Sequence, residues 1–513
     1  MKIAPDSVPD LANMDADALR QLVLGSMARQ QALQDELRYK EAKISKLTHE
    51  IAVLRRYRFG KKSEQLAGVQ GLLLDDTVDA DMAAIEQELI NLGGQPPVER
   101  TVAQPKRQAL PPQLPRIDIH HEPDSTHCSC GCQLQRIGED VAEKLDYVPG
   151  IFSVQRHIRG KWVCRQCQTL SQAPVPGHVI DKGLATTGLL AHVLVAKYGD
   201  HLPLYRQQKI FERAGVSLAR STLAQWVGVC GVQLQPLVDA LRQHVLGRRV
   251  LHADETPVQM LKPGTGRTHR AYLWAYAPGT FDDLRAVVYD FTEGRAGENA
   301  RTFLGDWQGS LVCDDYVGYK ACFTQGITEV GCMAHARRKF FELDDKSLLA
   351  GQALNYMGQL YDIERQVKNL NEHERWQLRQ QKARPLADAL HDWMLAQRQR
   401  VPDGTTIAKA LDYSLKRWVA LTRYLDDGSL PIDNNWVENQ VRPIVLGRKN
   451  WLFAGSLRAG KRAAAVMSMI QSAKLNGHDP YAYLKDVLDR LPTHPNSRID
   501  ELLPHNWSPA ASE

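Results

Sequence analysis

The stretch Arg249–Pro257, with the sequence RVLHADETP, is a short apolar run that ends in carboxylates and is followed by a proline. An apolar run of this length with a turn former behind it predicts a buried β-strand. We expect the strand to end at Asp254 and residues 255–257 to break it. The stretch Leu311–Asp315 (LVCDD) has the same form. If the two strands lie side by side in a sheet, they present Asp254 and Asp314 at one edge of it.

The residues around these two runs predict the rest of a mixed α/β domain. Residues 270–276 and 286–291 alternate as further strands, and residues 327–332 read as a fifth. Residues 296–304 have a helical pattern, and residues 334–425 look almost entirely helical. The sequence therefore predicts a sheet whose last strand is followed by a long helical segment.

The stretch Asp433–Pro443 (DNNWVENQVRP) places one carboxylate, Glu438, among asparagines and an arginine. A solvated helix face would carry several mixed charges, and a core helix would carry none. Packed across the sheet edge, this helix would bring Glu438 beside Asp254 and Asp314. Hard divalent cations need oxygen ligands, and two such ions can act on a phosphodiester. Arg442, one turn later, could neutralise phosphate.

Each of these acids also has a plainer interpretation. An Asp after a strand is usually a turn former or a helix cap, and a lone helical Glu is usually solvated. Asp315, which directly follows Asp314, is an alternative ligand. If the strand continues through Asp314, alternation directs the two side chains to opposite faces, but a strand that ends at Cys313 removes that argument.

Composition bounds the class of protein. A chain of 513 residues, 43% apolar and 24% charged, has the composition of a globular protein with three or four domains. Lys and Arg number 64 and Asp and Glu 59, so overall charge says little about partners. No apolar run is long enough to span a bilayer, and the first residues lack a signal-peptide core. We expect a cytoplasmic protein with no membrane partner.

Basic residues are clustered in three places, which indicates contact with nucleic acid. The clusters lie in residues 55–62, 336–339 and 447–450. The candidate DNA-binding residues in them are Arg55, Arg56, Arg58, Lys61, Lys62, Arg337, Arg338, Arg448 and Lys449, and Arg220 and Arg442 join them from elsewhere in the chain.

Five of the nine cysteines fall between residues 128 and 167, which is typical of a zinc ribbon rather than of a disulfide framework. The second knuckle, Cys164 and Cys167, has the standard spacing, whereas the first is irregular. We predict a zinc site of Cys128, Cys130, Cys164 and Cys167, with His127 or Cys132 as alternatives in the first knuckle. Buried free thiols are the other interpretation.

The N-terminal part predicts a coiled coil. Between Gln30 and Leu54 a heptad pattern runs for just over three repeats, with two polar interruptions. An ordinary amphipathic helix packed on its own domain is the alternative. Residues 66–115 shift to Gly, Gln and Pro, and they predict a mobile linker around one short helix.

Residues 202–227 have the pattern of a helix-turn-helix. One helical run ends at Ala214, residues 215–217 form a glycine turn, and a second run starts at Ser217 or Leu218 and reaches Val227. The second helix carries polar residues suited to the major groove: Arg220, Ser221, Thr222 and Gln225. Any helical hairpin gives the same pattern.

Four long motifs resemble a known family. They are His252–Pro257, Asp314–Tyr319, Val330–Phe340 and Ile432–Pro443. Together with residues 58–64 and 472–480 they closely resemble the large transposase of the insertion sequence sixty-six family, over nearly the whole chain. The resemblance implies a DDE catalytic triad on a ribonuclease H-like fold that needs magnesium or manganese.

Carried onto this sequence, the resemblance implies that the triad is Asp254, Asp314 and Glu438. One departure is visible, because the usual glycine after the second Asp is Asp315 here. Glu438 follows Asp314 by 124 residues, so the helical stretch after residue 340 would be an insertion. Cys332 and His335 invite a second zinc interpretation, but with only two ligands we favour a structural or DNA-proximal role.

The predicted fold class is a mixed, multidomain chain with an α/β catalytic core. Its parts are a coiled coil with a basic end (1–65), the linker (66–115), a zinc ribbon (116–178), a helix-turn-helix-like region (179–245), a ribonuclease H-like domain (246–460, with a helical insertion at about 341–430) and a helical tail (461–513).

The predicted function is metal-dependent cleavage at the ends of an insertion sequence and strand transfer into target DNA. The implied partners are terminal inverted repeats, target DNA, further copies of the chain and accessory proteins encoded by the element, in a bacterial cytoplasm. Two alternatives are a catalytically inactive zinc-containing DNA-binding protein or repressor, and a nuclease on the same fold that cuts without joining.

Overall fold

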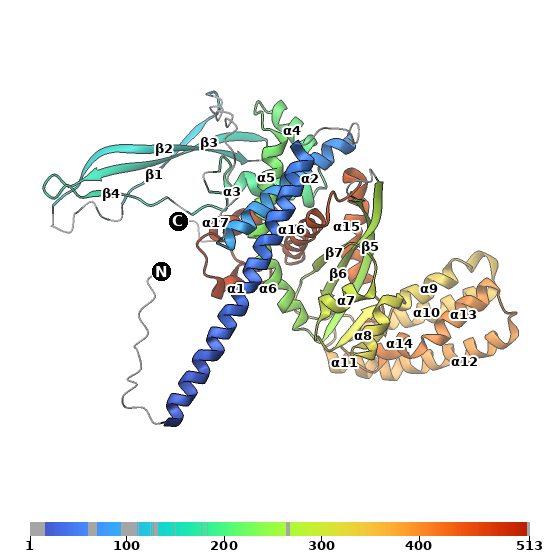
Figure 1. The fold of residues 1–513 in the computed structure, drawn as a ribbon. Coiled ribbons are helices and arrows are strands. Elements are labelled where there is room, and N and C mark those ends of the chain that lie inside the picture. The colour runs from blue at the N-terminus through green and yellow to red at the C-terminus, as the bar shows by residue number, and fades with distance from the viewer. Residues whose placement is uncertain are drawn as a thin grey trace. The chain divides into compact units, whose positions relative to one another are not determined.

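The computed structural model describes most of the chain (Figure 1). The described residues are 16–59, 69–93, 110, 112–123, 125, 127, 132–148, 150–175, 177–181, 183–262 and 267–509. Cys128, Cys130, Lys61 and Lys62 lie outside these ranges, as do the side chains of Arg56 and Arg58. The chain forms two compact units, of which the first comprises Met1–Lys61 and Met82–Lys106, and the second comprises Lys62–Asp81 and Arg107–Glu513.

The first unit is built from α1 (Ala16–Phe59) and the end of α2 (Val69–Asn91). Helix α1 has no proline and is rich in residues that favour helices, such as Leu, Ala, Arg, Gln and Glu. The core of the unit consists of Leu47, Ile51, Ile85 and Leu89. The second half of the predicted heptad therefore packs within the chain, as the alternative interpretation expects. Leu33 and Leu37, in its first half, are exposed.

The earlier part of α2 belongs to the second unit. Its buried Asp81 accepts hydrogen bonds from Arg462 at 3.0 Å and from Ser456. Arg462 lies on α16 (Leu457–Leu475), and both partners are nearly fully buried. Breaking such a pair leaves an uncompensated buried charge. The prediction of a linker around a short helix does not hold for α2, because this helix has 23 residues and is anchored by Asp81.

A four-stranded sheet dominated by one long hairpin follows. Its strands are β1 (Arg116–His121), β2 (Gln135–Val148), β3 (Ile151–Val163) and β4 (Leu170–Gln172). Strands β2 and β3 are antiparallel and turn at Gly150, whose φ of +90° is unfavourable for other residues. The register pairs Gln135 with Val163. Cys132 and Cys164, which flank this pair along the chain, therefore lie at the same end of the hairpin.

Four helices come next: α3 (Thr187–Tyr198), α4 (Leu204–Arg213), α5 (Arg220–Gln233) and α6 (Gln235–Leu246). Gly215, with φ of +84°, makes the turn between α4 and α5. Helix α5 begins two residues beyond Leu218 and continues past the predicted end at Val227. Most of it is buried, and Ser221 and Gln225 are its exposed residues. A helix, a glycine turn and a second helix are present, and the exposed polar surface of the second helix is short.

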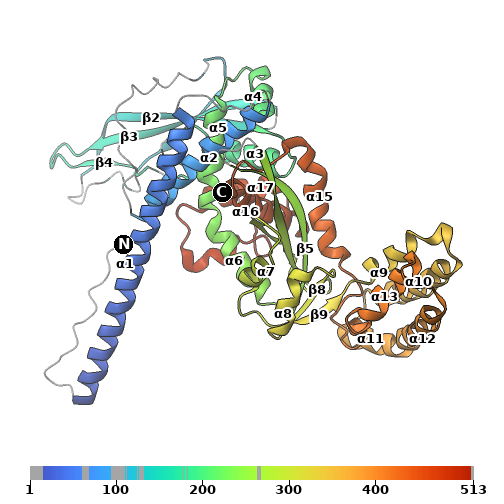
Figure 2. The same ribbon diagram turned by 45° about the vertical axis from the view of Figure 1, so that its right-hand side comes forward.

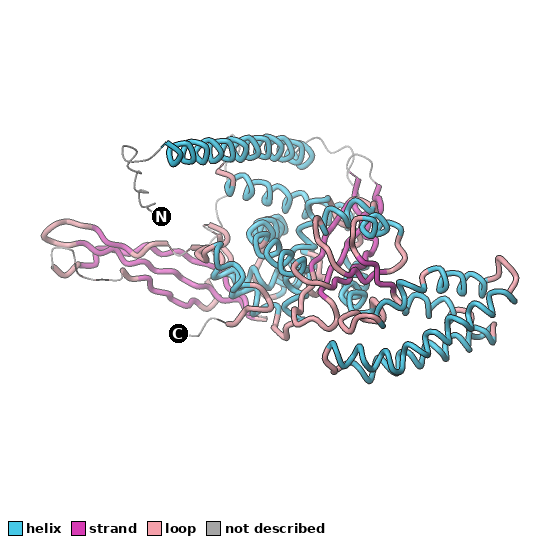
Figure 3. The backbone as a smooth tube through the Cα atoms, turned by 90° about the horizontal axis from the view of Figure 1, so that it is seen from below, coloured by secondary structure: helices cyan, strands magenta, loops and turns pink. Residues whose placement is uncertain are grey.

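The central sheet has five strands. They are β5 (Val250–Lys262), β6 (Arg267–Pro278), β7 (Val288–Thr292), β8 (Ser310–Cys313) and β9 (Thr328–Gly331). The order is β7-β6-β5-β8-β9. The pairs β5–β6 and β6–β7 are antiparallel, whereas β8 and β9 continue the sheet parallel to β5. Figure 3 shows the strands of both sheets in magenta.

Strand β5 does not stop at Asp254, so the predicted break at residues 255–257 is wrong. The strand pairs with β6 along its whole length. Strand β8 pairs with β5 only up to His252, so the other edge of β5 is open where Pro257 lies. A proline, which has no N–H to donate, is tolerated in a strand at such an open edge.

Helices cover the sheet and one of its edges. Helix α15 (Asn435–Trp451) runs beside β5 in both Figure 1 and Figure 2. Helix α16 covers the edge strand β7, where the hydroxyls of Ser468 and Ser472 accept from the backbone N–H groups of Tyr289 at 2.8 Å and Val287 at 3.0 Å. These bonds satisfy backbone N–H groups at the edge of the sheet, in place of hydrogen bonds to a further strand. Helix α17 (Pro480–Arg490) packs against α3 and α16.

The segment between β9 and α15 is helical, as the sequence predicts. Its main helices, labelled in Figure 1, are α9 (Met333–Phe341), α10 (Leu348–Val367), α11 (Glu372–Leu378), α12 (Arg384–Arg400), α13 (Thr406–Lys416) and α14 (Trp418–Thr422). They have a hydrophobic core of their own. The fully buried Arg379 donates twice to Glu364, at 2.8 and 2.6 Å.

Within the described ranges, no helix combines the length and apolar character that crossing a bilayer requires.

Candidate active site

Asp254 and Asp314 come together through the parallel pairing of β5 and β8. Val312 pairs with His252, so the residues two positions further along each strand direction are Asp254 and Asp314. Asp314 follows the last residue of β8 and accepts the backbone N–H of Tyr316 at 2.9 Å. The sheet thus brings to one place two acids that are 60 residues apart in the chain.

Glu438 reaches the same place from the first turn of α15. Burial raises the pKa of Asp254 well above its usual range, and the negative charges of Glu255, Glu438 and Asp314 raise it further. The three predicted carboxylates are therefore close enough to interact. Carboxylate oxygens gathered in a partly buried site are a suitable donor set for a hard divalent cation, which would offset their mutual repulsion.

The start of α15 is held on the sheet by Asn434, which is fully buried. Its side-chain amide donates to the carbonyl of Ala253 at 2.9 Å, and its oxygen lies 2.8 Å from Nδ1 of His252. Its backbone N–H donates to Sγ of Cys332 at 3.2 Å. These bonds connect β5, the end of β9 and α15, and so they determine where Glu438 lies.

His252 is the sheet-side partner in this arrangement. Its Nε2 lies 3.2 Å from the hydroxyl of Thr280. Burial lowers the pKa of His252 to about 4, so the ring is neutral near neutral pH. Sequence reasoning quoted His252 and Asn434 inside motifs but assigned neither a role. His252 could have been noticed as a polar residue in an apolar run, whereas Asn434 stands among other polar residues and gave no separate signal.

Glu255 is a fourth acid that sequence reasoning did not assign. Its side chain is almost fully buried and accepts from Arg295, with Nε at 2.8 Å, and from the hydroxyl of Tyr319 at 2.9 Å. Burial raises the pKa of Glu255, and Arg295 opposes that change. The Arg295 guanidinium also lies over the ring of Tyr316, 3.8 Å from its centroid. This group adds one compensated negative charge beside Asp254.

Asp315 faces a different environment from Asp314. Its carboxylate forms ion pairs with Arg417, on the helical segment, and with Lys320 at 3.2 Å. Strand β8 ends at Cys313, so strand alternation is not what separates the two side chains. The separation comes from the turn at Asp314 and from the cations that hold Asp315. The additional acid at this position is thus paired with cations outside the three-carboxylate group.

The predicted zinc ligands are described in part. Cys164, at the end of β3, is buried, and Cys167 is exposed with its Sγ 3.1 Å from the hydroxyl of Thr169. The thiol of Cys132 contacts the side chain of Gln166, which lies between the two cysteines of the second knuckle. Cys132 is therefore a neighbour of the second knuckle. Thiolates gathered at one end of a hairpin fit a structural zinc ion.

The predicted DNA-binding residues fall into two groups. Arg338, Arg442 and Lys449 are exposed, and Arg337 is half-buried with its guanidinium over Phe341. Helix α15 carries Arg442 and Lys449 on the same element as Glu438. Arg442 lies about one turn beyond Glu438 on this helix.

The other three described residues are engaged inside the protein. Arg55 donates to Glu86 at 2.8 Å, Arg220 forms an ion pair with the buried Asp76 at 2.7 Å, and Arg448 donates to the carbonyl of Pro257 at 2.7 Å. The Arg220 contact explains why α5 offers little positive charge at its surface. The position of this buried acid could not be read from the sequence.

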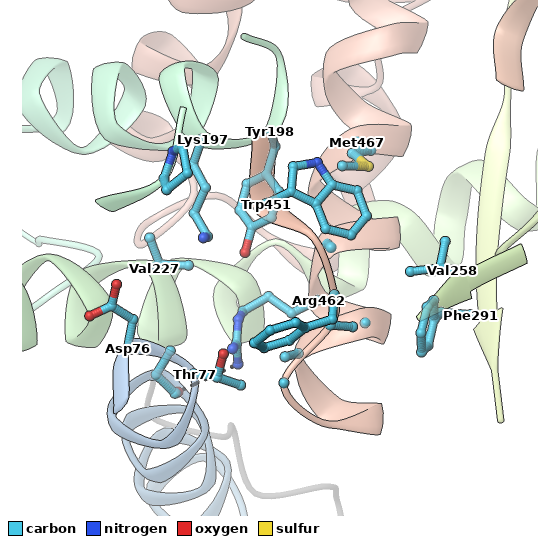
Figure 4. A pocket seen from close by; sticks show the side chains of 18 of the residues that line it. Asp76, Thr77, Lys197, Tyr198, Val227, Val258, Phe291, Trp451, Arg462 and Met467 are labelled. Atoms are coloured by element: carbon cyan, nitrogen blue, oxygen red, sulfur yellow. Dashed lines mark hydrogen bonds between the residues drawn. The ribbon is translucent and has the colours of Figure 1, made fainter. Parts of the chain in front are cut away.

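A separate cavity of about 90 Å³ lies between α2, α3, α15 and α16. Figure 4 shows Lys197, Tyr198, Trp451 and Arg462 around it, with Asp76 at its edge. Burial lowers the pKa of Lys197 to about 8. The described residues that line the cavity include none of the three carboxylates. It belongs to the packing of α2 and not to the acidic site.

Comparison with known families identifies the class. The chain carries a transposase domain, because the family described as "Transposase IS66 family" matches residues 182–462. Three further matches follow the same chain: "Transposase C of IS166 homeodomain" over residues 46–119, "zinc-finger binding domain of transposase IS66" over residues 125–168 and "IS66 C-terminal element" over residues 468–505. The chain belongs to the IS66 family of transposases, which confirms the resemblance seen in the sequence.

Full-length relatives support this membership. The chain is similar to the uncharacterized proteins y4hP and y4qI of Sinorhizobium fredii. The first is 36% identical over 92% of this chain and 89% of the relative, and the second is 35% identical over 98% and 99%. A third, y4jD of the same organism, is 35% identical over 90% of this chain and 94% of its own length.

Proposed function

We propose that this protein is a DNA transposase that cleaves at the ends of its insertion sequence and joins them to target DNA, using Asp254, Asp314 and Glu438. The observation that carries the proposal is the convergence of these acids from β5, the end of β8 and α15, with the pKa of Asp254 raised by burial and by the other carboxylates. An acidic site of this kind requires cations. Membership of the IS66 transposase family supports the same reaction.

The fold supports the assignment of the core. We infer a ribonuclease H-like domain at residues 246–460 from the strand order β7-β6-β5-β8-β9, with three antiparallel strands followed by two parallel ones. The helical segment between β9 and α15 is then an insertion in that domain, at about residues 341–430. Its own hydrophobic core explains how the domain accommodates so long a segment before Glu438.

The carboxylates would hold Mg²⁺ or Mn²⁺. When bound, two such ions supply Lewis-acid stabilisation to the attacking and leaving oxygens of an in-line displacement. Asp254 and Asp314 hold the oxygen donors on the rigid sheet. Asn434 and His252 keep the start of α15 in place so that Glu438 completes the set. Arg295 neutralises Glu255 and so limits the repulsion around Asp254.

The reaction has two phosphoryl-transfer steps. Water attacks the phosphorus at the element end, the bond to the 3′ oxygen breaks, and a 3′ hydroxyl is released. That hydroxyl then attacks a phosphodiester of the target, so that one P–O bond forms as another breaks. Neither step requires a covalent protein–DNA intermediate or an external energy source.

DNA binding is assigned to other parts of the chain. The zinc-finger region would use Cys164 and Cys167 with ligands of the first knuckle to hold a structural Zn²⁺. The exposed cations Arg338, Arg442 and Lys449 would contact phosphates, so binding should weaken as salt rises. The exposed apolar residues in the first half of α1, including Leu33 and Leu37, would pair copies of the chain for synapsis of two ends.

Strand transfer tests this function against its two alternatives. Purified protein is incubated with labelled element ends, Mg²⁺ and a target plasmid, and the joints are mapped. We expect cut ends joined to the plasmid. Cut ends without joints would favour a nuclease, and bound but uncut ends would favour a zinc-containing DNA-binding protein or repressor.

A further inference from the structure

Cys332, His335 and Glu438 form a cluster of metal-binding side chains at the junction of β9, α9 and α15. Cys332 is the residue before α9, His335 lies in its first turn, and Glu438 comes from α15. One ligand atom from each residue lies within 4.8 Å of both others. Sequence spacing supplied only the first two residues, and the packing of α15 supplies the third.

The separations fit one ion. A tetrahedral Zn²⁺ with bonds of about 2.0–2.3 Å holds its ligand atoms roughly 3.3–3.8 Å apart. Nδ1 of His335 and Oε1 of Glu438 are 3.7 Å apart, which is too long for a hydrogen bond but suitable for two ligands of one metal ion. A shift of about 1 Å brings atoms 4.8 Å apart into that range, which a side-chain rotation achieves.

Two of the three ligand atoms are not satisfied by a hydrogen bond from any described residue. In the part of the chain that the structure describes, Nδ1 of His335 and Oε1 of Glu438 are buried and find no hydrogen-bond partner. Buried polar atoms without partners are rare and often mark an ion that binds there. The thiol of Cys332 accepts one N–H from Asn434, which leaves a sulfur lone pair for a metal.

A neighbouring acid does not belong to this cluster. Asp433 accepts from the hydroxyl of Tyr361 at 2.9 Å and from the side chain of Asn435 at 2.8 Å. Three protein ligands therefore remain, and they leave a fourth position for water. Cys332 lies at the positive end of α9, but burial raises the pKa of its thiol to about 12, so a bound metal ion and not the helix would hold it as a thiolate.

We propose that Cys332, His335 and Glu438 bind a transition-metal ion of intermediate softness, such as Zn²⁺, at a site separate from the zinc-finger region. Sulfur and imidazole ligands select such an ion over Mg²⁺. Binding replaces the thiol proton with a metal–sulfur bond and releases that proton to water. Because Glu438 is also one of the three proposed catalytic carboxylates, zinc bound here withdraws it from the magnesium site and inhibits the enzyme.

Cobalt binding tests the site without any activity assay. The full chain is stripped of metal and titrated with Co²⁺, whose bond to a thiolate gives a charge-transfer absorption band. The zinc-finger cysteines remain intact in every variant. The number of Co²⁺ ions that each variant binds is therefore subtracted from the number that the unaltered chain binds. We expect Cys332→Ser and His335→Gln each to bind one Co²⁺ fewer per chain, with affinity at this site reduced more than about 100-fold. Serine still accepts the N–H of Asn434, so the fold should persist, and circular dichroism checks it.

Cys322→Ser is the matched control, because Cys322 is buried like Cys332 but lies outside the cluster. It should bind as many Co²⁺ ions as the unaltered chain. Equal Co²⁺ stoichiometry and equal spectra for the unaltered chain, Cys332→Ser and His335→Gln would overturn the proposal. In that outcome His335 and Glu438 are only an ion pair.

Zinc inhibition is the second arm, and it rests on the proposed transposase function. Strand transfer in Mg²⁺ is measured with and without one added equivalent of Zn²⁺ beyond the zinc-finger content. Each variant is expressed relative to its own activity without added zinc. We expect at least about tenfold inhibition of the unaltered chain, and little change for Cys332→Ser. Cobalt binding without zinc inhibition would retain the site and reject the sharing of Glu438.

Discussion

The zinc-finger region and the acidic site assemble their ligands in opposite ways. In the zinc-finger region the cysteines lie two or three residues apart within each knuckle, and the pairing of Gln135 with Val163 brings Cys132 and Cys164 to one end of the hairpin. In the acidic site Asp254, Asp314 and Glu438 are separated by 60 and 124 residues and meet through a parallel strand pair and a helix. The first site depends on local chain geometry, and the second depends on the whole central sheet.

This difference predicts which part of the fold a ligand substitution disturbs. A ligand change in the zinc-finger region should unfold the knuckle end of the hairpin and leave the central sheet intact, because Leu145 and Phe152 join the main core at the other end of the hairpin. A ligand change in the acidic site should leave the fold intact, because the sheet and α15 are held by hydrophobic packing and by Asn434. Substitutions in the zinc-finger region should therefore weaken DNA binding, and substitutions in the acidic site should reduce catalysis.

The largest effect should come from the acidic site. Asp254→Ala, Asp314→Ala and Glu438→Ala should each reduce cleavage and joining at least about 1,000-fold, or roughly 4 kcal/mol, because each removes a proposed metal ligand. End binding in a gel-shift assay should change by less than about threefold. A variant that joins ends at a near-normal rate would remove its residue from the triad.

The zinc-finger region should give the second effect. Cys164→Ser and Cys167→Ser should each lose about one zinc ion per chain and weaken end binding by roughly 100-fold, because a structural zinc ion contributes its binding energy to folding. Elemental analysis and gel shift measure the two quantities. Thermal unfolding of the remaining chain should be unchanged, and a global loss of stability would contradict the separation of the regions.

The pH dependence of stability tests the role of His252 beside the acidic site. The folded-state pKa of about 4 lies below the ordinary value of 6.5, so the unfolded chain binds the proton more readily. Stability from this residue is present above pH 6.5 and is lost as pH falls toward 4, by on the order of 3 kcal/mol. Denaturant unfolding across that window should show a shallower loss for His252→Gln. Parallel curves for the two proteins would contradict a buried neutral His252.

Asp315 should give the smallest effect on chemistry. Asp315→Asn should change metal-dependent cleavage by less than about threefold, because Arg417 and Lys320 already hold this carboxylate away from Asp254. Asp314→Asn is the matched change one position earlier and should abolish cleavage. If Asp315→Asn alone loses cleavage while both variants still bind DNA, the second ligand is Asp315.

The strands that carry Asp254 and Asp314 were predicted better than the structure around them. The apolar runs around Asp254 and Asp314 identified two neighbouring strands, because burial of a central strand leaves a local signature in the chain. The extension of β5 past Pro257 was missed, because it depends on an edge that β8 leaves open. The anchor of α2 was missed for a similar reason, since the partner of Asp81 lies 381 residues away at Arg462.

The sequence by itself determined the family, the residue types of both proposed metal-binding regions and the helical character of the segment before Glu438. These properties follow from side-chain chemistry and short-range periodicity, which are present in any stretch of chain. Only the tertiary structure decided which acids face one another, that Asp315 is held by Arg417, and that Glu438 lies beside Cys332 and His335. Such proximity arises from strand pairing and helix packing, whose free energy is distributed over many residues and is carried by no single motif.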